Sequence, residues 1–307
     1  MANFLCVCLS STIQKTIVFN KVRLTEVNRS TSYRLDASGK AINTARILTQ
    51  IHPESTISIC PLGENNAALF DELALRDNMY IDYVTIPGFT RECCTLLDME
   101  NHTTTELVVG EPAVNLTENQ YKKIESEFLK KIKSKLEYAD YVLLAGSRPV
   151  FWEKDIYARI AKMCLDEGKI FLADFHGQDL QTTLDCCTPS IIKINQEEFE
   201  ATFYQGKKLS ESELKDSIIE KSSQLKNMII ITRGTEDTFA ANKGDFYTCP
   251  IIKLEPVNTT ACGDSFNAGF LHELSISNDF ELALKEGTWC AAQNALCQCP
   301  GSVRTNI

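Results

Sequence analysis

Short runs of consecutive apolar residues alternate with segments of helical periodicity along most of this chain of 307 residues. Strands that are apolar on both faces are typical of parallel sheets buried under helices, and each helix then serves as the crossover to the next parallel strand. The pattern therefore predicts an α/β fold with a mainly parallel central sheet flanked by helices on both faces. We expect its strands at residues 3–9, 56–60, 81–86, 139–145, 169–173, 190–194 and 228–233, with an added hairpin at 237–249. We expect helices at residues 65–77, 117–137, 152–167, 177–185, 196–204, 211–226, 264–276 and 279–297, and an earlier one that starts near Ser38.

Two other regions, at about 15–37 and 90–110, alternate apolar and polar residues without a helical stripe. Such alternation predicts strands with one buried and one exposed face. We expect these strands to form a small second sheet, which would serve as a lid over a site or as a dimerisation surface.

The composition disfavours several classes of protein. A formal net charge of −10, from 31 basic and 41 acidic residues, argues against a nucleic-acid surface, because phosphate backbones need a basic footprint. The 13 cysteines are odd in number and include no Cys-x-x-Cys, so we predict reduced core residues of a cytoplasmic protein. No run reaches the roughly 18 apolar residues of a membrane span, and residues 1–10 lack the basic start of a signal peptide.

The segment 258–270, Asn-Thr-Thr-Ala-Cys-Gly-Asp-Ser-Phe-Asn-Ala-Gly-Phe, joins an extended run to a helical pattern. Small residues at such a junction let backbone N–H groups point into a shared space, and the helix N-terminus adds partial positive charge, so the place suits an anion. Asp264 would repel a resting anion, but it makes sense as a base that takes a proton from a hydroxyl attacking a bound phosphoryl group. The alternative is an aspartate that caps a helix after a glycine turn.

Other polar or turn-forming residues follow predicted strands at their carboxyl ends, where ligands bind in open α/β sheets. Ser147, Asn195 and Gly234 hold such positions. No Gly-x-Gly-x-x-Gly follows an early strand and no Gly-x-x-x-x-Gly-Lys-Ser/Thr occurs, which disfavours a Rossmann dehydrogenase and a P-loop kinase.

In this order, the motifs resemble those of the ribokinase-like (PfkB) carbohydrate kinases, most of all the branch that holds tagatose-6-phosphate kinase and 1-phosphofructokinase. The resemblance runs from Val27-Asn-Arg29 to Gly301. It implies one ribokinase-like domain over residues 1–307 that includes the lid. The activity it implies is ATP-dependent phosphoryl transfer to a hydroxyl of a sugar or sugar phosphate, of the tagatose 6-phosphate, fructose 1-phosphate or fructose 6-phosphate type. It also implies a homodimer formed through the lid.

Ala261-Cys262-Gly263-Asp264 matches the family's Gly-Ala-Gly-Asp anion hole. The resemblance implies that Asp264 is the general base and that the amides of 261–264 hold the γ-phosphate, where each fixed donor is worth ~3–4 kcal/mol. The family's first glycine is Ala261 here. If that position requires a positive φ, alanine costs on the order of 1 kcal/mol and its methyl group crowds the phosphate.

Several residues are predicted on the acceptor side. The run Ser38-Gly-Lys-Ala-Ile-Asn43 matches the family's Gly-Gly-Lys-Gly-x-Asn, which implies substrate contacts from Gly39, Lys40 and Asn43; the alternative is a helix start with an exposed lysine. Arg91 stands where this branch has an arginine that clamps substrate phosphate, and its planar fork suits that task. Ser147 lies in the family's Gly-Ser-x-Pro turn beside the substrate.

Gln14 is the departure that matters most. The branch usually has Asn-Pro-x-x-Asp, in which the aspartate holds sugar hydroxyls, and here the run is Ser10-Ser-Thr-Ile-Gln14. The identity of the acceptor therefore does not follow from the resemblance. Two alternatives stay open: a catalytically weakened or non-catalytic protein that binds nucleotide or sugar phosphate, and a nucleoside or vitamin kinase of the same fold.

On the nucleotide side, Asn195-Gln-Glu-Glu198 fits the family's Asn-x-x-Glu element, in which Glu198 acts through water on the Mg²⁺ that accompanies ATP. The same residues also suit a helix N-cap with a glutamate at the third helical position. Thr232 and Gly234 correspond to a turn beside the nucleotide phosphates and ribose, and Asn294 matches a position that lines the adenine pocket.

Overall fold

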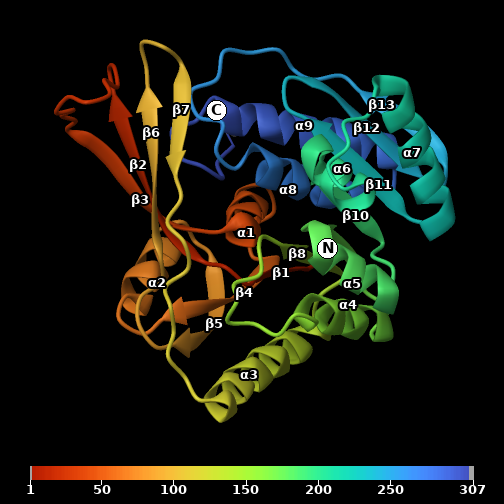
Figure 1. Ribbon diagram of the computed structural model, residues 1–307, viewed down its shortest axis with the longest axis horizontal. Coiled ribbons are helices and arrows are strands. Elements are labelled where there is room, and N and C mark those ends of the chain that lie inside the picture. Colours follow the sequence, from red (N-terminus) through yellow and green to blue (C-terminus); the bar gives the residue numbers. More distant parts are fainter. Residues whose placement is uncertain (1, 304–307) are drawn as a thin grey trace.

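A computed structural model of the protein describes residues 2–303, and a nine-stranded sheet runs through its centre (Figure 1). The sheet order is β13-β12-β11-β10-β9-β8-β1-β4-β5. The strands from β5 across to β11 pair in parallel, and β12 and β13 add an antiparallel hairpin at one edge. This confirms the predicted parallel sheet with a hairpin. The strands are β1 (Phe4–Cys8), β4 (Thr56–Gly63), β5 (Tyr80–Ile86), β8 (Tyr141–Ala145), β9 (Ile170–Asp174), β10 (Ile191–Asn195), β11 (Met228–Arg233), β12 (Glu236–Asn242) and β13 (Asp245–Cys249).

Helices cover both faces of the sheet. Successive strand residues point to opposite faces, so each central strand contributes apolar side chains to a buried cluster on either side. In β1, Phe4, Cys6 and Cys8 join one buried apolar cluster, whereas Leu5 and Val7 join the other. The first cluster includes residues of α1 (Lys40–Ile51), α2 (Ala67–Arg76), α8 (Cys262–Ser277) and α9 (Phe280–Ala295). The second includes residues of α3 (Glu118–Leu136), α4 (Ile156–Asp166), α5 (Gly177–Cys186), α6 (Gln196–Tyr204) and α7 (Glu211–Leu225).

Helix α4 begins four residues later than the predicted position 152. Trp152 instead lies in a turn, where its backbone N–H donates to the Pro149 carbonyl at 3.1 Å. Its indole N–H donates to the Leu9 carbonyl at 3.0 Å, which ties the turn to the end of β1. Within residues 2–303, no helix is both long and apolar enough to cross a membrane.

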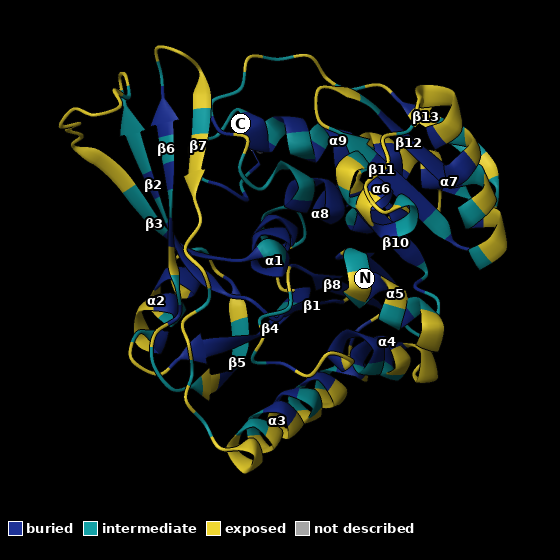
Figure 2. Ribbon diagram, in the orientation of Figure 1, coloured by how far each residue is buried: buried dark blue, intermediate teal, exposed yellow. Residues whose placement is uncertain are grey.

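A second sheet of four strands stands beside the first, in the order β3-β2-β6-β7, and we call it the lid sheet. Figure 2 shows that the outer strand β7 is exposed along most of its length and β3 only at its start, whereas β6 is largely buried. The pairing register places Gln14, Thr16 and Thr95 on one face, and all three are buried. The strands are β2 (Thr12–Phe19), β3 (Ser32–Ser38), β6 (Glu92–Asp98) and β7 (Thr103–Leu107).

Candidate active site

The start of α8 lies where the carboxyl ends of the central strands meet the lid sheet. Its N-cap residue, Ala261, has a left-handed backbone with φ 66° and ψ 13°. The position therefore has the positive φ for which we predicted a cost of alanine. The amides of Gly263 and Asp264 belong to the first helical turn, which leaves them without an intrahelical acceptor. The Cys262 N–H differs, since it donates to the Thr259 carbonyl at 3.3 Å.

The side chain of Asp264 is buried at the contact between α8 and α1. Its Oδ2 accepts a hydrogen bond from Asn43 Nδ2 at 2.8 Å, and the Asn43 carbonyl oxygen Oδ1 accepts one from Ser38 Oγ at 2.8 Å. Burial, and then the nearby charge of Asp174, raise the pKa of Asp264 to about 6. Lys40 and Asn43 act in the opposite direction without cancelling this effect.

A second carboxylate, Asp174, ends β9 and is fully buried. Its Oδ1 lies 3.0 Å from Lys40 Nζ, and its Oδ2 lies 3.2 Å from Lys193 Nζ. Asn267 Nδ2 donates to the same Oδ2 at 2.6 Å. Burial alone would raise the pKa of Asp174, but Lys193 and Lys40 outweigh it and hold that pKa well below its usual range. We call Lys40, Asp174, Lys193 and Asp264 the transfer cluster.

Lys193 and Asp174 were missed by the sequence analysis. A Cβ atom on Gly263 would lie only 2.9 Å from Lys193 Nζ, so the ammonium group sits at the first turn of α8. This also explains the glycine at 263. A signal was present in the sequence, because Lys193 is a charged residue between the apolar residues Ile192 and Ile194 of a buried strand. Buried lysines without a partner are rare.

Gly39 brings the start of α1 against the end of β1. Its φ is 133°, and a Cβ there would lie 2.8 Å from Cys8 Sγ and 2.9 Å from the Ser10 carbonyl oxygen. Glycine is therefore needed for this close approach. Of the predicted residues that follow Ser38, Asn43 bonds Asp264 directly and Lys40 lies close enough to influence its charge, paired to Asp174 rather than simply exposed.

Of the other predicted acceptor residues, Arg91 precedes β6 and pairs with Glu111, its Nε lying 3.2 Å from Oε1. Gln14 is buried on β2, and its Nε2 donates to Thr95 Oγ1 at 2.9 Å. Ser147 is exposed after the end of β8. We call Ser10, Arg91 and Glu111 the acceptor cluster, since Arg91 Nη2 also donates to Ser10 Oγ at 2.7 Å.

The predicted nucleotide residues lie at the ends of β10 and β11. Asn195 Oδ1 accepts from the Glu198 N–H at 2.8 Å, and Glu198 Oε2 accepts from the Asn195 N–H at 2.9 Å, so the capping box is present. Glu198 Oε1 also lies 3.6 Å from Lys40 Nζ, which brings it to the transfer cluster. Thr232 is the penultimate residue of β11, and Gly234 lies in the turn just after the strand, with a φ of 65°.

Asn294 on α9 is fully buried. Its Nδ2 donates to the Thr260 carbonyl at 2.8 Å, and its Oδ1 accepts from the Gly301 N–H at 2.7 Å. The residue therefore ties the segment before α8 to the segment after α9. A contact with adenine stays a prediction.

Comparison with known proteins decides the family of this chain, because the model of the pfkB family carbohydrate kinases matches residues 3–305. The chain belongs to the pfkB family. It is an ATP-dependent carbohydrate kinase, as the resemblance of its motifs implied.

Solved structures of pfkB-like fold superpose over almost the whole chain. Phosphofructokinase-2 from Escherichia coli in complex with fructose-6-phosphate is 15% identical, with a TM-score of 0.83 over 98% of this chain and 96% of that chain. A possible 1-phosphofructokinase from Thermotoga maritima is 17% identical, with a TM-score of 0.82 over 94% and 90%. Ribokinase from T. maritima is 19% identical, with a TM-score of 0.71 over 98% and 95%. The fold is therefore ribokinase-like.

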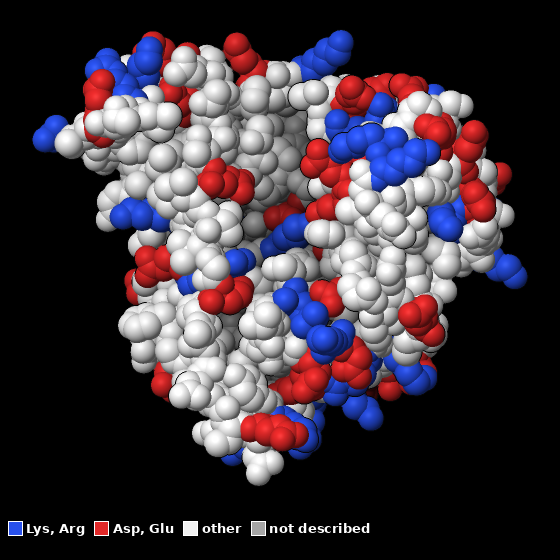
Figure 3. All heavy atoms as spheres, viewed as in Figure 1, with Lys and Arg blue, Asp and Glu red and all other residues white. Residues whose placement is uncertain are grey.

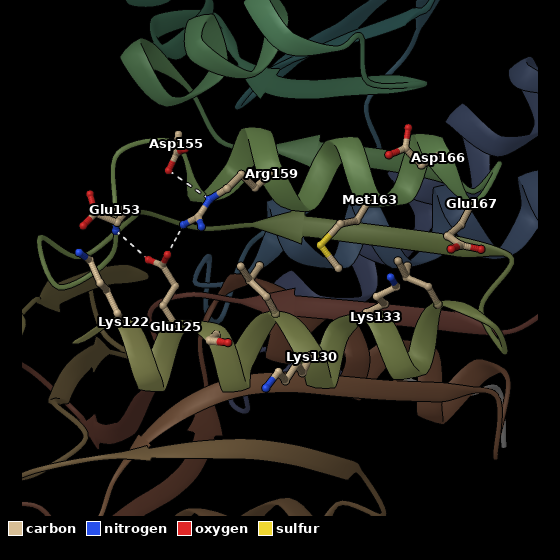
Figure 4. Close-up of a pocket in the computed structure, with 13 residues that line it drawn as sticks. Lys122, Glu125, Lys130, Lys133, Glu153, Asp155, Arg159, Met163, Asp166 and Glu167 are labelled. Atoms are coloured by element: carbon tan, nitrogen blue, oxygen red, sulfur yellow. Dashed lines mark hydrogen bonds and ion pairs between the residues drawn. The ribbon is translucent and has the colours of Figure 1, made fainter. Parts of the chain in front are cut away.

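The surface of this pfkB kinase is hollowed between the lid sheet and the part that carries β10 to β13 (Figure 3). Acidic and basic side chains gather at the lower end of this hollow. A separate cavity of about 730 Å³ lies between α3 and α4 (Figure 4). Its lining includes none of the predicted site residues, and its Arg159 is already paired with Glu125 and Asp155. Size alone does not make that cavity the active site.

Proposed function

We propose that this kinase transfers the γ-phosphoryl group of ATP to a hydroxyl of a sugar phosphate of the tagatose 6-phosphate, fructose 1-phosphate or fructose 6-phosphate type. Asp264 is the general base. The observation that carries the proposal is the contrast between two neighbouring carboxyl groups, since the surroundings lower the pKa of Asp174 and raise that of Asp264 to about 6. Environments that separate two pKa values in this way assign acid–base roles.

In the proposed reaction, Asp264 accepts the proton of the acceptor hydroxyl as that oxygen bonds to the γ-phosphorus and the bond to ADP breaks. A base works best when its pKa lies near the working pH, where it is ionised yet still basic. A pKa of about 6 meets that condition better than the ordinary value of 3.8. Asn43 orients the carboxylate through its 2.8 Å hydrogen bond.

The donor side of the reaction calls for positive charge and fixed N–H groups aimed at the γ-phosphate. The amides of 261–264 supply the N–H groups in our proposal, and Lys193 and Lys40 supply the charge. Asp174 holds both ammonium groups in place from its buried position. No step requires either lysine to lose its proton.

The residues near Lys40 also fit the Mg²⁺ that accompanies ATP. Mg²⁺ prefers oxygen ligands and keeps several waters, and its role is to neutralise charge on the triphosphate. Glu198 and Asn195 offer a carboxylate and a carboxamide close to the transfer cluster. Among residues 2–303 no cluster of three His, Cys, Asp or Glu side chains suits a metal.

Release of ADP across a panel of acceptors tests this proposal. The three sugar phosphates should each be compared with fructose, tagatose, a nucleoside and a vitamin-type alcohol. We expect ATP-dependent turnover with at least one of the sugar phosphates and little with the unphosphorylated sugars. Turnover confined to the nucleoside or the vitamin-type alcohol would contradict the proposed acceptor class.

We also propose that the protein forms a homodimer through the outer face of the lid sheet. The register places Ile17, Tyr33 and Leu96 on that face, and Leu107 lies beside them. Tyr33 and Leu107 are 63% and 50% exposed, and apolar patches of this kind mark interaction surfaces.

Light scattering after gel filtration tests the dimer. It should give twice the chain mass, and Leu107→Lys should shift the measured mass toward that of one chain. A one-chain mass for the unaltered protein at every concentration would exclude this dimer.

A further inference from the structure

Arg91, predicted to clamp the phosphate of the acceptor, already holds an anion that belongs to the protein itself. Arg91 Nη2 donates to Ser10 Oγ at 2.7 Å, and Nη1 donates to the Val109 carbonyl at 3.2 Å. The Glu111 Oε1 atom lies 3.2 Å from Arg91 Nε and also accepts from Ser10 Oγ. One carboxylate oxygen therefore meets both a guanidinium and a hydroxyl.

The fit of Glu111 to this site is incomplete. Both of these contacts go through Oε1, although Arg and a carboxylate can form two parallel hydrogen bonds. Arg91 Nε is buried and makes no hydrogen bond within the described residues, because Oε1 is near it but out of line. A buried N–H group without an acceptor costs free energy, so a ligand oxygen in line with Arg91 Nε would bind favourably there. A phosphate has enough oxygens to meet Nε, Nη2 and Ser10 together.

Ser10, Arg91 and Glu111 differ in how firmly the fold holds them. Ser10 is buried after β1 and Arg91 directly precedes β6. Glu111 lies in residues 108–117, which form neither helix nor strand, and 26% of its side chain is exposed. Glu111 is therefore the partner that can leave without disturbing a sheet.

We propose that Glu111 is an internal competitor that occupies the place of the acceptor's phosphate on Arg91 and Ser10. The inference rests on the proposed function and adds a selectivity residue to it. A phosphate dianion that replaces the single charge of Glu111 gains attraction to Arg91, whereas a neutral hydroxyl gains none. Glu111 thus weakens binding of every ligand at this position and leaves the phosphorylated acceptor as the one that displaces it.

The location agrees with an acceptor that spans from this site to Asp264. The Ser10 carbonyl oxygen is in contact range of Gly39, at the start of α1. Asn43, one helical turn or about 5.4 Å further along α1, donates to Asp264. Ser10 and Asp264 therefore contact α1 at positions about one helical turn apart, a separation suited to a small sugar.

Calorimetric titration with inorganic phosphate, in the absence of nucleotide, tests the proposal without requiring turnover. We expect Glu111→Gln to bind phosphate about tenfold more tightly than the unaltered protein, as befits release of a half-buried charge pair. Arg91→Gln, alone or combined with Glu111→Gln, should remove this gain, and any phosphate binding that persists in it belongs to the anion hole at the start of α8. The matched control is Glu64→Gln, an exposed residue on the turn after β4 whose backbone N–H donates to the Ile86 carbonyl. This variant removes the same charge and should leave phosphate affinity within about twofold.

With whichever sugar phosphate is turned over, Glu111→Gln should lower KM several-fold and leave kcat unchanged, because the residue acts on binding alone. Unchanged or weaker phosphate binding by Glu111→Gln would overturn the proposal and show that the pair only fixes the segment after β7. Glu111→Ala gives the same comparison if the glutamine variant does not fold, as judged by circular dichroism. Tighter phosphate binding without turnover of any acceptor would support the inference and contradict the proposed function, so the two failures are separable.

Discussion

The transfer cluster and the acceptor cluster both pair acidic with basic side chains, but they are built differently. Asp174, Lys193 and Asp264 lie on regular elements, β9, β10 and α8, and are buried. In the acceptor cluster, Arg91 lies at the start of a lid strand and Glu111 on a segment without regular structure. Rigid elements fix reacting groups closely, whereas loops allow exchange of partners. If both of our proposals hold, the difference teaches that the reacting groups are held firmly while the choice of acceptor depends on a movable charge.

The largest effect is expected at the base. Asp264→Asn should lower kcat by about 10²- to 10⁴-fold, because the variant cannot accept the proton of the acceptor hydroxyl. Coupled ADP release with the preferred acceptor measures this loss. Asp185→Asn, an exposed residue of α5, is the matched control and should retain its rate. Full turnover by Asp264→Asn would remove Asp264 from the mechanism.

The Asp264→Asn variant should be no less stable than the unaltered protein above pH 6. The pKa of Asp264 rises from 3.8 to about 6 on folding, so the stability that its protonated form contributes is present below pH 3.8 and lost as the pH passes 6. At pH 8 the ionised carboxylate therefore costs stability, by up to roughly 3 kcal/mol for a shift of this size. Urea unfolding at pH 8 should show Asp264→Asn equal or higher in free energy of unfolding, and a clear loss would contradict the raised pKa.

Asp174 should behave in the opposite way. Its pKa is lowered on folding, so its contribution is present above the unfolded value and lost only as the pH falls through the lower folded value. Asp174→Asn leaves two ammonium groups without their shared partner, and breaking buried pairs of this kind costs about 3–5 kcal/mol. Urea unfolding at pH 7 measures the loss, against Asp185→Asn as control. A loss below about 1 kcal/mol would mean that the pairs are not desolvated.

The pH dependence of kcat/KM gives a finer comparison between these two carboxylates. The rate should rise with pH through about 6 and then level, since Asp264, as the proposed base, has to be ionised to accept a proton. Asp174 is the nearby charge that helps to raise this pKa, so Asp174→Asn should move the rising limb to lower pH by roughly one unit. A limb that stays in place would show that burial alone sets the pKa of Asp264.

The helices and strands, and the start of α8, could be predicted from the sequence, because local residue patterns determine them. Apolar runs placed the strands within a few residues, and a motif placed Asp264. The partners of the charged residues were not predictable in this way. Lys40 meets Asp174 across 134 positions, and Ser10 meets Glu111 across 101. Such contacts depend on which strands become neighbours and on the path of a segment without regular structure, so neither spacing nor periodicity reveals them.

The smallest expected effect concerns Ala261, the one position of the anion hole where the local prediction was conditional. Its φ of 66° lies in the left-handed region, where glycine is unstrained and alanine is not. Ala261→Gly should raise the free energy of unfolding by roughly 0.5–1 kcal/mol, because relief of strain exceeds the added entropy of the unfolded chain. Urea unfolding measures this, and Ala268→Gly, in the buried middle of α8, is the control that should lose stability. If the methyl group also crowds the γ-phosphate, the KM for ATP falls in Ala261→Gly. An unchanged KM with higher stability would instead show that the phosphate fits beside alanine, and that this departure affects the fold and not the reaction.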